Sequence, residues 1–339
     1  MTYLARLAAI LAVAAGIGGA GGAVAQKRDA VRFGTNWVAQ AEHGGYYQAV
    51  ADGTYARYNL DVTIVPGGPQ ANNRMMLPVG RIDFYMGGNM LQAFDAVKEN
   101  IPTLVVAAIF QKEPQVLLAH PGQGFDRFED LKKSNDIFVS KEGLATYFQW
   151  MKTEFGFREE QTKPYTYNAA PFIANKRAVM QGYLSSEPLA VEKQGGFKPV
   201  VHLLADNGFD TYATTIEGRR EMVEKQPDVV QRFVDASVIG WANYLYGDRE
   251  AANAAIKRDN PEMTDEQIAY SISKMKEYGI VDSGDAQKLG IGAMTDARMK
   301  SFFDKMVKAG LFKADLDYRK SYTLQFVNKG VGLDIKPKQ

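Results

Sequence analysis

The sequence predicts an α/β protein with two α/β lobes and a helical C-terminal part. Three observations carry this prediction. Short β-type runs alternate with helical runs from Val31 to Ile109, the same alternation restarts at Val116, and helical periodicity dominates after Thr215. A β-α-β-α-β order is typical of a mostly parallel sheet with helices on both faces. Two successive units of this kind therefore indicate two lobes.

The first unit is defined by apolar runs that end in turn residues. Leu60 to Val65 alternates in polarity and stops at a Pro-Gly-Gly-Pro turn, which marks a strand and its end. Asn89 stands where it can cap the helix that follows. The expected strands are 31–35, 60–65, 83–86 and 103–109, and the expected helices are 44–58, 69–77 and 89–98.

The second unit and the C-terminal helices follow the same criteria. We expect strands at 116–119, 137–140, 165–167 and 200–204, and helices at 143–155, 171–179 and 186–193. Later helices are expected at 227–246, 248–258, 264–278 and 295–309. The helix that starts at Pro227 carries an apolar stripe, which assigns Trp241 to the core. We therefore assign 26–114 and 211–339 to the first lobe and 115–210 to the second.

The N-terminus has the pattern of a cleavable export signal. Arg6 precedes an apolar run from Leu7 to Ile17, and a small-residue stretch ends at Ala25. The alternative, an uncleaved anchor, is disfavoured because a membrane span needs about 20 apolar residues. We expect cleavage after Ala25, which removes residues 1–25. No later segment is apolar enough to span a bilayer.

Composition excludes several kinds of chemistry. The formal net charge is +1, and loss of Arg6 with the signal makes the chain neutral, so nucleic acid is not an expected partner. The chain has no cysteine, which excludes a disulfide, a thiol nucleophile and a cysteine-bound lipid or metal. Its three histidines are far apart, without metal-ligand spacing. We expect no metal and no cofactor.

The loop at 36–47 is the first candidate ligand site, because parallel sheets bind ligands at the carboxyl ends of their strands. Gly44 leaves backbone amides accessible at a helix start, and Trp37 and Tyr46 offer flat faces to a planar ligand. His43 lies in the same loop. The alternative is that the aromatic residues belong to the core and the glycine only permits a turn.

Three further loops follow strands. Gly88 and Asn89 end one strand before a capped helix, and Ser140 begins another strand-to-helix loop. Tyr183 and Glu187 flank a pair of serines, where a carboxylate beside an aromatic ring could pair with an amino-substituted heterocycle. The alternative is that Glu187 only stabilises the first turn of the following helix, where the helix dipole favours an acidic residue. No P-loop, G-x-G-x-x-G after a strand, G-x-S-x-G or clear acid–base pair is present, so we expect no catalysis.

The first loop also carries a resemblance to a known family. The residues that carry it are Asn36-Trp37, the run Glu42-His43-Gly44-Gly45-Tyr46-Tyr47-Gln48-Ala49, Gly53 to Val62, Gly67-Gly68-Pro69-Gln70 and Gly80 to Phe84. This sequence pattern resembles the thiamine pyrimidine-precursor-binding family among the periplasmic solute-binding proteins of ABC importers. The resemblance covers most of residues 31–216.

The resemblance implies a type II periplasmic-binding-protein fold, in which the ligand lies in a cleft between the lobes. It further implies a monomeric periplasmic protein that delivers a small molecule to an inner-membrane ABC permease with its ATPase. Trp37 and Tyr46 would stack on or line the ligand. Glu187 would meet its amino group, with Tyr183 nearby, although Tyr-Leu-Ser-Ser-Glu-Pro departs from the family's usual wording.

The resemblance does not fix the ligand. Relatives with the same lobes bind nitrate, taurine, alkanesulfonates or riboflavin, so an anion or riboflavin is the alternative ligand. An anion binder would use helix-start amides and an Arg rather than Glu187. A fungal branch of this fold is an enzyme that makes the pyrimidine from its own histidine. His43 stands where that histidine would lie, but the enzyme also needs a cysteine-rich iron motif that this chain lacks.

Overall fold

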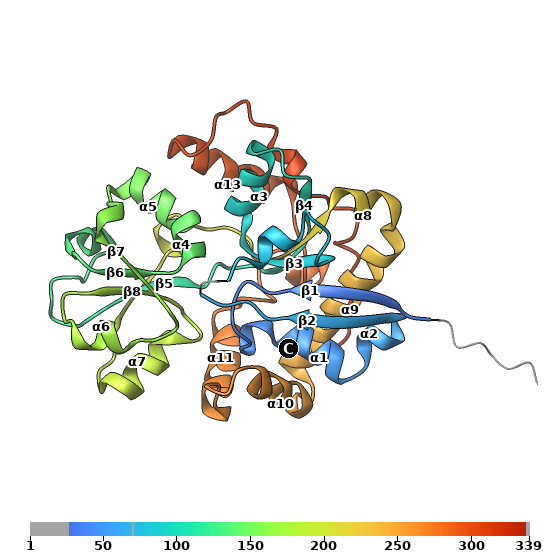
Figure 1. Cartoon of the computed structure of the whole chain (residues 1–339), viewed down its shortest axis with the longest axis horizontal. Coiled ribbons are helices and arrows are strands. Elements are labelled where there is room, and N and C mark those ends of the chain that lie inside the picture. The colour runs from blue at the N-terminus through green and yellow to red at the C-terminus, as the bar shows by residue number, and fades with distance from the viewer. Residues whose placement is uncertain (1–26, 70, 337–339) are drawn as a thin grey trace, which may run out of the picture.

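The computed structural model describes residues 27–69 and 71–336, and the predicted signal at 1–25 lies outside them. Its strands form two separate five-stranded sheets, each covered by helices (Figure 1). The two α/β lobes and the helical C-terminal part predicted from the sequence are confirmed. We call the body around the first sheet lobe I and the body around the second sheet lobe II.

The sheet of lobe I has the order β2-β1-β3-β10-β4. Its strands are β1 (Asp29–Gly34), β2 (Leu60–Val65), β3 (Phe84–Asn89), β4 (Thr103–Phe110) and β10 (Ala213–Arg219). Strand β10 runs antiparallel to both of its neighbours, β3 and β4, whereas β1 pairs in parallel with β2 and β3. Strands β3 and β4 are buried along their whole length, as expected for a sheet with both faces covered.

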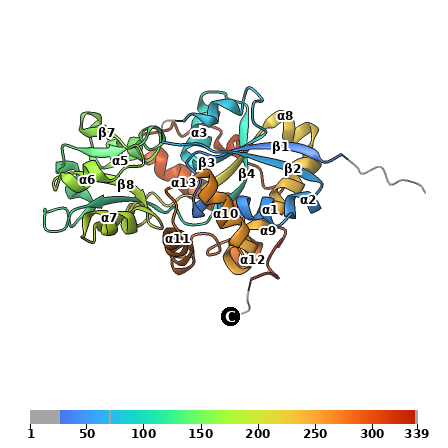
Figure 2. The ribbon, with the colours of Figure 1, turned by 60° about the horizontal axis from the view of Figure 1, so that its bottom comes forward.

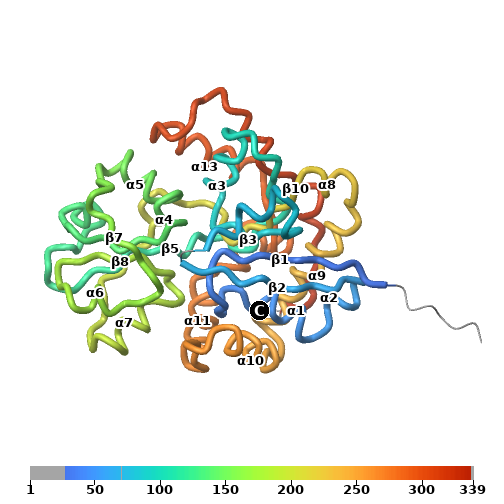
Figure 3. Tube along the Cα trace, in the orientation of Figure 1, coloured from blue at the N-terminus to red at the C-terminus, as the bar shows by residue number. Residues whose placement is uncertain are grey.

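The sheet of lobe II has the order β7-β6-β8-β5-β9 and repeats this plan. Its strands are β5 (Gln115–Ala119), β6 (Ile137–Val139), β7 (Thr162–Pro164), β8 (Val179–Tyr183) and β9 (Val200–Leu203). Strand β5 is antiparallel to β8 and β9, whereas β6 is parallel to β7 and β8. In the tube view these green segments gather on one side of the molecule (Figure 3).

Helices pack against both sheets. They are α1 (Gly44–Ala51), α2 (Thr54–Arg57), α3 (Met90–Lys98), α4 (Lys141–Ala145), α5 (Tyr147–Phe155), α6 (Ala170–Ala174), α7 (Glu187–Gly195), α8 (Arg220–Lys225), α9 (Pro227–Tyr246), α10 (Glu250–Asp259), α11 (Asp265–Glu277), α12 (Ala286–Leu289) and α13 (Asp296–Lys308). The predicted stripe of α9 is buried, and Trp241 is fully enclosed in the core. The described residues contain no helix long and apolar enough to cross a membrane.

Helix α11 connects the two lobes. It lies between them in Figure 1 and again in the rotated view of Figure 2. The Ser271 hydroxyl donates to the Ser185 carbonyl at 2.7 Å, and the Gln267 side-chain amide donates to the Ser186 carbonyl at 3.2 Å. The C-terminal helical part thus contacts lobe II directly.

Several predictions are wrong. The sheets were expected to be mostly parallel, but as many neighbouring strands pair antiparallel as parallel. The strand expected at 165–167 lies at Thr162–Pro164, and the helix expected at 171–179 stops at Ala174. Strand β8, which follows that helix, was not predicted. The helix expected at 44–58 breaks at Gly53, whose φ of 74° lies in the left-handed region. Among the described residues of 69–77, only a 3₁₀ turn at Asn73–Met76 is helical.

Candidate ligand-binding site

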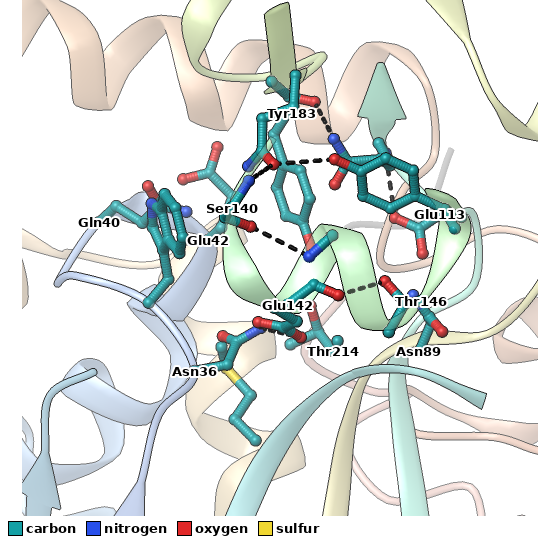
Figure 4. Close-up of a pocket in the computed structure, with 18 of the residues that line it drawn as sticks. Asn36, Gln40, Glu42, Asn89, Glu113, Ser140, Glu142, Thr146, Tyr183 and Thr214 are labelled. Atoms are coloured by element: carbon teal, nitrogen blue, oxygen red, sulfur yellow. Dashed lines mark hydrogen bonds between the residues drawn. The ribbon is translucent and has the colours of Figure 1, made fainter. Parts of the chain in front are cut away.

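A pocket lies between the two lobes, with lining residues from both (Figure 4). It holds about 610 Å³ of space free of protein atoms, open solvent included. Its lining residues are Asn36, Trp37, Gln40, Glu42, His43, Met86, Gly88, Asn89, Glu113, Gln115, Ser140, Glu142, Gly143, Thr146, Tyr147, Gln181, Gly182, Tyr183, Glu187 and Thr214. Most come from strand ends and the turns that follow them.

Helix caps shape two sides of the pocket. The Asn89 carboxamide oxygen accepts from the Leu91 N–H at 3.1 Å and starts α3. The Ser140 hydroxyl oxygen accepts from the Gly143 N–H at 3.1 Å and starts α4. These interactions satisfy amides that a helix start leaves free. The predicted residues Asn89 and Ser140 therefore face the pocket with one of their polar atoms already used.

The structure brings together most of the predicted site residues and separates two of them. Those that line the pocket are Trp37, His43, Gly88, Asn89, Ser140, Tyr183 and Glu187. Gly44 and Tyr46 do not. Tyr46 is enclosed in the core, with ring centroids 4.4 Å from Phe33 and 5.9 Å from Trp241. Gly44 lies against the ring of Tyr244, where a Cβ atom would come within 2.0 Å. Both residues pack α1 against the core. The prediction that they lie at the ligand is therefore corrected.

Three glutamates at the pocket were missed by the sequence analysis. Glu42 and Glu142 lie in loops that were selected because they follow predicted strands. Nothing in the sequence distinguished these two glutamates from their neighbours in those loops. Glu113 lies in the segment that joins β4 to β5, outside every predicted strand-to-helix loop. With Glu187 they place four carboxyl groups in one pocket.

The four carboxyl groups differ in their partners. Both Glu142 oxygens lie 2.9 Å from the Asn36 side-chain amide, which donates across the two lobes. One Glu42 oxygen accepts from the Ser185 hydroxyl, again between lobes. One Glu113 oxygen accepts from the Gln115 N–H at 3.0 Å.

Glu187 is held within its own lobe. Its carboxylate accepts from the Tyr165 hydroxyl at 3.0 Å and from the Tyr183 N–H at 2.7 Å. The residue is buried and lines the pocket, as the resemblance implied, but both of its oxygens already accept a hydrogen bond from protein.

Burial dominates the electrostatics of the pocket. It raises the pKa of Glu42 and of Glu142 to about 7 each, and the pKa of Glu113 to about 8. Burial also raises the pKa of Glu187, and it lowers the pKa of His43 to about 3, so this imidazole is neutral at ordinary pH.

None of the described residues that line the pocket is Lys or Arg. Arg74, behind it, donates to the Gln92 carbonyl at 2.7 Å and to Glu217 at 3.3 Å. In the described part of the chain, no group of three or more His, Cys, Asp and Glu side chains is arranged to hold a metal ion.

Aromatic rings supply the apolar surface. Trp37 from lobe I lies nearly parallel to Tyr165 from lobe II, with ring centroids 6.1 Å apart and an interplanar angle of 12°. Tyr147 and Tyr183 line the pocket together with Trp37, whereas Tyr165 lies behind Trp37 and does not line it. Flat rings beside hydrogen-bonding groups suit a planar, polar ligand.

The comparison with family models decides the family. The model described as NMT1/THI5 like matches residues 40–251, which include the loop at 36–47 from Gln40 onward and all of lobe II. The chain belongs to the NMT1/THI5-like family. Assignment to its thiamine pyrimidine-precursor branch is a finer statement, which we take up as a proposal.

Individual relatives are more distant. The chain is 23% identical to the riboflavin-binding protein RibY of Chloroflexus aurantiacus over 311 residues, covering 88% of this chain and 86% of that protein. It is 15% identical to the alkanesulfonate-binding protein SsuA of Xanthomonas axonopodis pv. citri, with 88% and 99% covered and a TM-score of 0.64.

Two further solved structures show how widely this fold is used. The ligand-binding component of an ABC-type import system from Staphylococcus aureus matches at 13% identity, with 88% and 98% covered and a TM-score of 0.63. The desulfurization enzyme DSZB matches at 14% identity, with 91% and 99% covered and a TM-score of 0.56. The fold is thus that of periplasmic binding proteins, and it also occurs in an enzyme, so function has to be argued from the pocket.

Proposed function

We propose that this chain is the periplasmic substrate-binding component of an ABC importer, and that it binds a small planar heterocycle with amino groups, such as a thiamine pyrimidine precursor. One observation carries the ligand class: the interlobe pocket combines aromatic rings with four buried carboxyl groups, and no Lys or Arg is among its described lining residues. An aminopyrimidine has a flat ring and N–H donors, which match both features.

The proposed mechanism is a population shift without chemistry. We propose that residues 115–210 move as one lobe against the rest of the chain, and that ligand favours the closed arrangement. The contacts that join the lobes support this proposal, because Asn36–Glu142, Glu42–Ser185 and the Trp37–Tyr165 ring pair all border the pocket. The closed complex would then be recognised by a membrane permease with its ATPase.

Riboflavin is the second candidate ligand, because the match to RibY spans most of both chains. An anion such as a sulfonate or nitrate is disfavoured, since the described lining residues offer it four buried carboxyl groups and no Lys or Arg. The pyrimidine-forming synthase is disfavoured by the absence of cysteine from the sequence.

Calorimetry with the purified mature chain tests the proposal. The ligands are hydroxymethylpyrimidine, formylaminopyrimidine, riboflavin, an alkanesulfonate and nitrate, each with a thermal-shift measurement in parallel. We expect heat and a raised melting temperature with at least one pyrimidine. Binding of riboflavin alone would select the second candidate, and binding of an anion alone would overturn the ligand class.

A further inference from the structure

The unpartnered polar atoms of the pocket are mostly oxygens, and those of its glutamates accept hydrogen bonds when the carboxyl group is ionised. One carboxyl oxygen of Glu42 and one of Glu113 have no hydrogen-bond partner among the described residues, and both side chains are 1% exposed. The side-chain oxygens of Asn36 and Gln40 are likewise unpaired there. A buried acceptor without a donor costs stability, so four of them in one pocket call for a functional reason.

Glu42 and Glu113 reach the pocket from different elements. Glu42 stands in the 3₁₀ turn Ala41–His43, directly before α1, and Glu113 stands in the segment that crosses from β4 to β5. The two side chains lie on opposite sides of the pocket in the close-up (Figure 4). In each, one oxygen is fixed by a protein donor, from Ser185 or from the Gln115 backbone, while the second is unpaired.

Glu187 is built differently. Its two oxygens accept from the Tyr165 hydroxyl and the Tyr183 N–H, so it holds an aromatic ring and the end of β8 in place. Gly182 lies directly beneath it, where a Cβ atom would come within 2.7 Å of the Glu187 Cβ. These contacts give Glu187 the position of a residue that orients the pocket wall.

We infer that Glu42 and Glu113 determine the specificity of the pocket, that its solute is an amino-bearing molecule without negative charge that donates hydrogen bonds to both, and that Glu187 is a positioning residue. This inference rests on the proposed function, since it takes the pocket as the solute site. The family resemblance implied that one carboxylate, that of Glu187, meets the ligand. The inference assigns this contact instead to Glu42 and Glu113, on opposite sides of the ligand.

The roles of Glu42, Glu113 and Glu187 can be tested by combining protein variants with a ligand analogue. Wild type and the variants Glu42→Gln, Glu113→Gln and Glu187→Gln are titrated with hydroxymethylpyrimidine and with its analogue that carries hydrogen in place of the amino group. The exposed Glu160→Gln is the matched control. Wild type and Glu160→Gln should prefer the amino compound by tenfold to a hundredfold, the range of one charge-assisted hydrogen bond.

The preference ratio separates direct contact from positioning. We expect it to fall toward one in Glu42→Gln or Glu113→Gln, whichever meets the amino group, and to survive in Glu187→Gln even where overall affinity drops. Survival of the ratio in both Glu42→Gln and Glu113→Gln would overturn the inference while leaving the proposed function intact. Tight binding of an alkanesulfonate without binding of the pyrimidine would overturn both.

A second measurement needs no ligand. At pH 8 and without ligand, Glu42→Gln and Glu113→Gln should melt at higher temperature than wild type, because each removes an unpaired buried carboxyl group. Glu187→Gln should melt lower, because its carboxylate accepts two hydrogen bonds, and Glu160→Gln should melt as wild type. If no pyrimidine binds, the proposed function fails, and this comparison still shows whether Glu42 and Glu113 serve stability. Lower melting of both Glu42→Gln and Glu113→Gln would make these residues structural and overturn it.

Discussion

At the scale of the residue, the buried glutamates predict how stability depends on pH. Each carboxyl group with a raised pKa holds its proton more tightly in the folded chain, so folded stability falls as the pH rises from about 4.5 to about 7 or 8. His43 acts in the opposite direction, since its lowered pKa costs folded stability as the pH falls below about 6.5. Each pKa unit corresponds to about 1.4 kcal/mol.

The ligand-free protein should therefore melt highest near pH 4–5, because three carboxyl groups outweigh one histidine above pH 4.5, and its melting temperature should fall by several degrees by pH 8. Thermal melts in buffers from pH 4 to pH 9 measure this profile. His43→Gln should raise the melting temperature below about pH 6.5 relative to its value at pH 7, and the exposed Glu160→Gln should reproduce the wild-type curve. A wild-type melting temperature that rises steadily from pH 5 to pH 8 would contradict the assigned pKa shifts.

A second residue-scale prediction concerns Gly88. A Cβ atom there would lie 2.2 Å from a Glu142 oxygen, so Gly88→Ala should push Glu142 away from Asn36 and weaken one contact between the lobes. We expect ligand affinity to drop by about tenfold or more, the value of a charge-assisted hydrogen bond, with little change in the melting temperature. Gly218→Ala is the control, because its Cβ would meet Phe84 at an ordinary 3.4 Å. Equal affinities of Gly88→Ala and wild type would argue against this role.

The candidate site could be predicted from the sequence only where local rules apply. Trp37, Gly88 and Ser140 were found because strand ends and helix caps leave a local pattern. Tyr46 was misplaced because the predicted ligand loop at 36–47 overlaps the helix predicted from Gly44, and Tyr46 lies within that helix, where its ring packs in the core. Glu113 left no signal, since its place at the pocket depends on how β4 continues into the other sheet.

At the scale of the element, the strands and helices that were predicted best are the long ones. The apolar stripe of α9 and the strand β4 were recognised because each repeats its pattern over many residues. Strand β8 was missed because Val179–Tyr183 is short and contains Gly182, and its strand character comes from pairing with β5 and β6. Tertiary pairing therefore decided the element where local propensity was weak.

The crossing of α1 and α9 is the element contact that fixes the first loop. Gly240 packs against the backbone of α1, where a Cβ atom would lie 2.3 Å from the Gly45 carbonyl oxygen and 2.7 Å from the Ala49 Cβ. Gly240→Ala should therefore lower stability by about 1–3 kcal/mol, as overpacking of a rigid core does. Urea unfolding measures the change, with Gly218→Ala again as the tolerated control. A Gly240→Ala variant as stable as wild type would mean that the helices can separate without cost.

At the scale of the whole molecule, closure of the lobes should depend on contacts that lie away from the ligand. Helix α11 donates from Gln267 and Ser271 to the carbonyls of Ser186 and Ser185, and neither α11 residue lines the proposed ligand pocket. Loss of these two hydrogen bonds should favour the open arrangement while every side chain that lines the pocket is kept. Each is worth about 1 kcal/mol, so the closed population relative to the open one should fall by roughly tenfold or more.

The double variant Gln267→Ala/Ser271→Ala should therefore show a larger radius of gyration in solution scattering without ligand, and ligand should return it to the wild-type value. The ligand affinity of the double variant should fall by no more than the factor by which its closed population falls. The reason is that the ligand binds the closed arrangement, which is then less populated. Ser273→Ala, exposed on the same helix, is the matched control and should change neither quantity. If the double variant kept the wild-type radius but lost affinity, α11 would act on the pocket wall rather than on the balance between open and closed lobes.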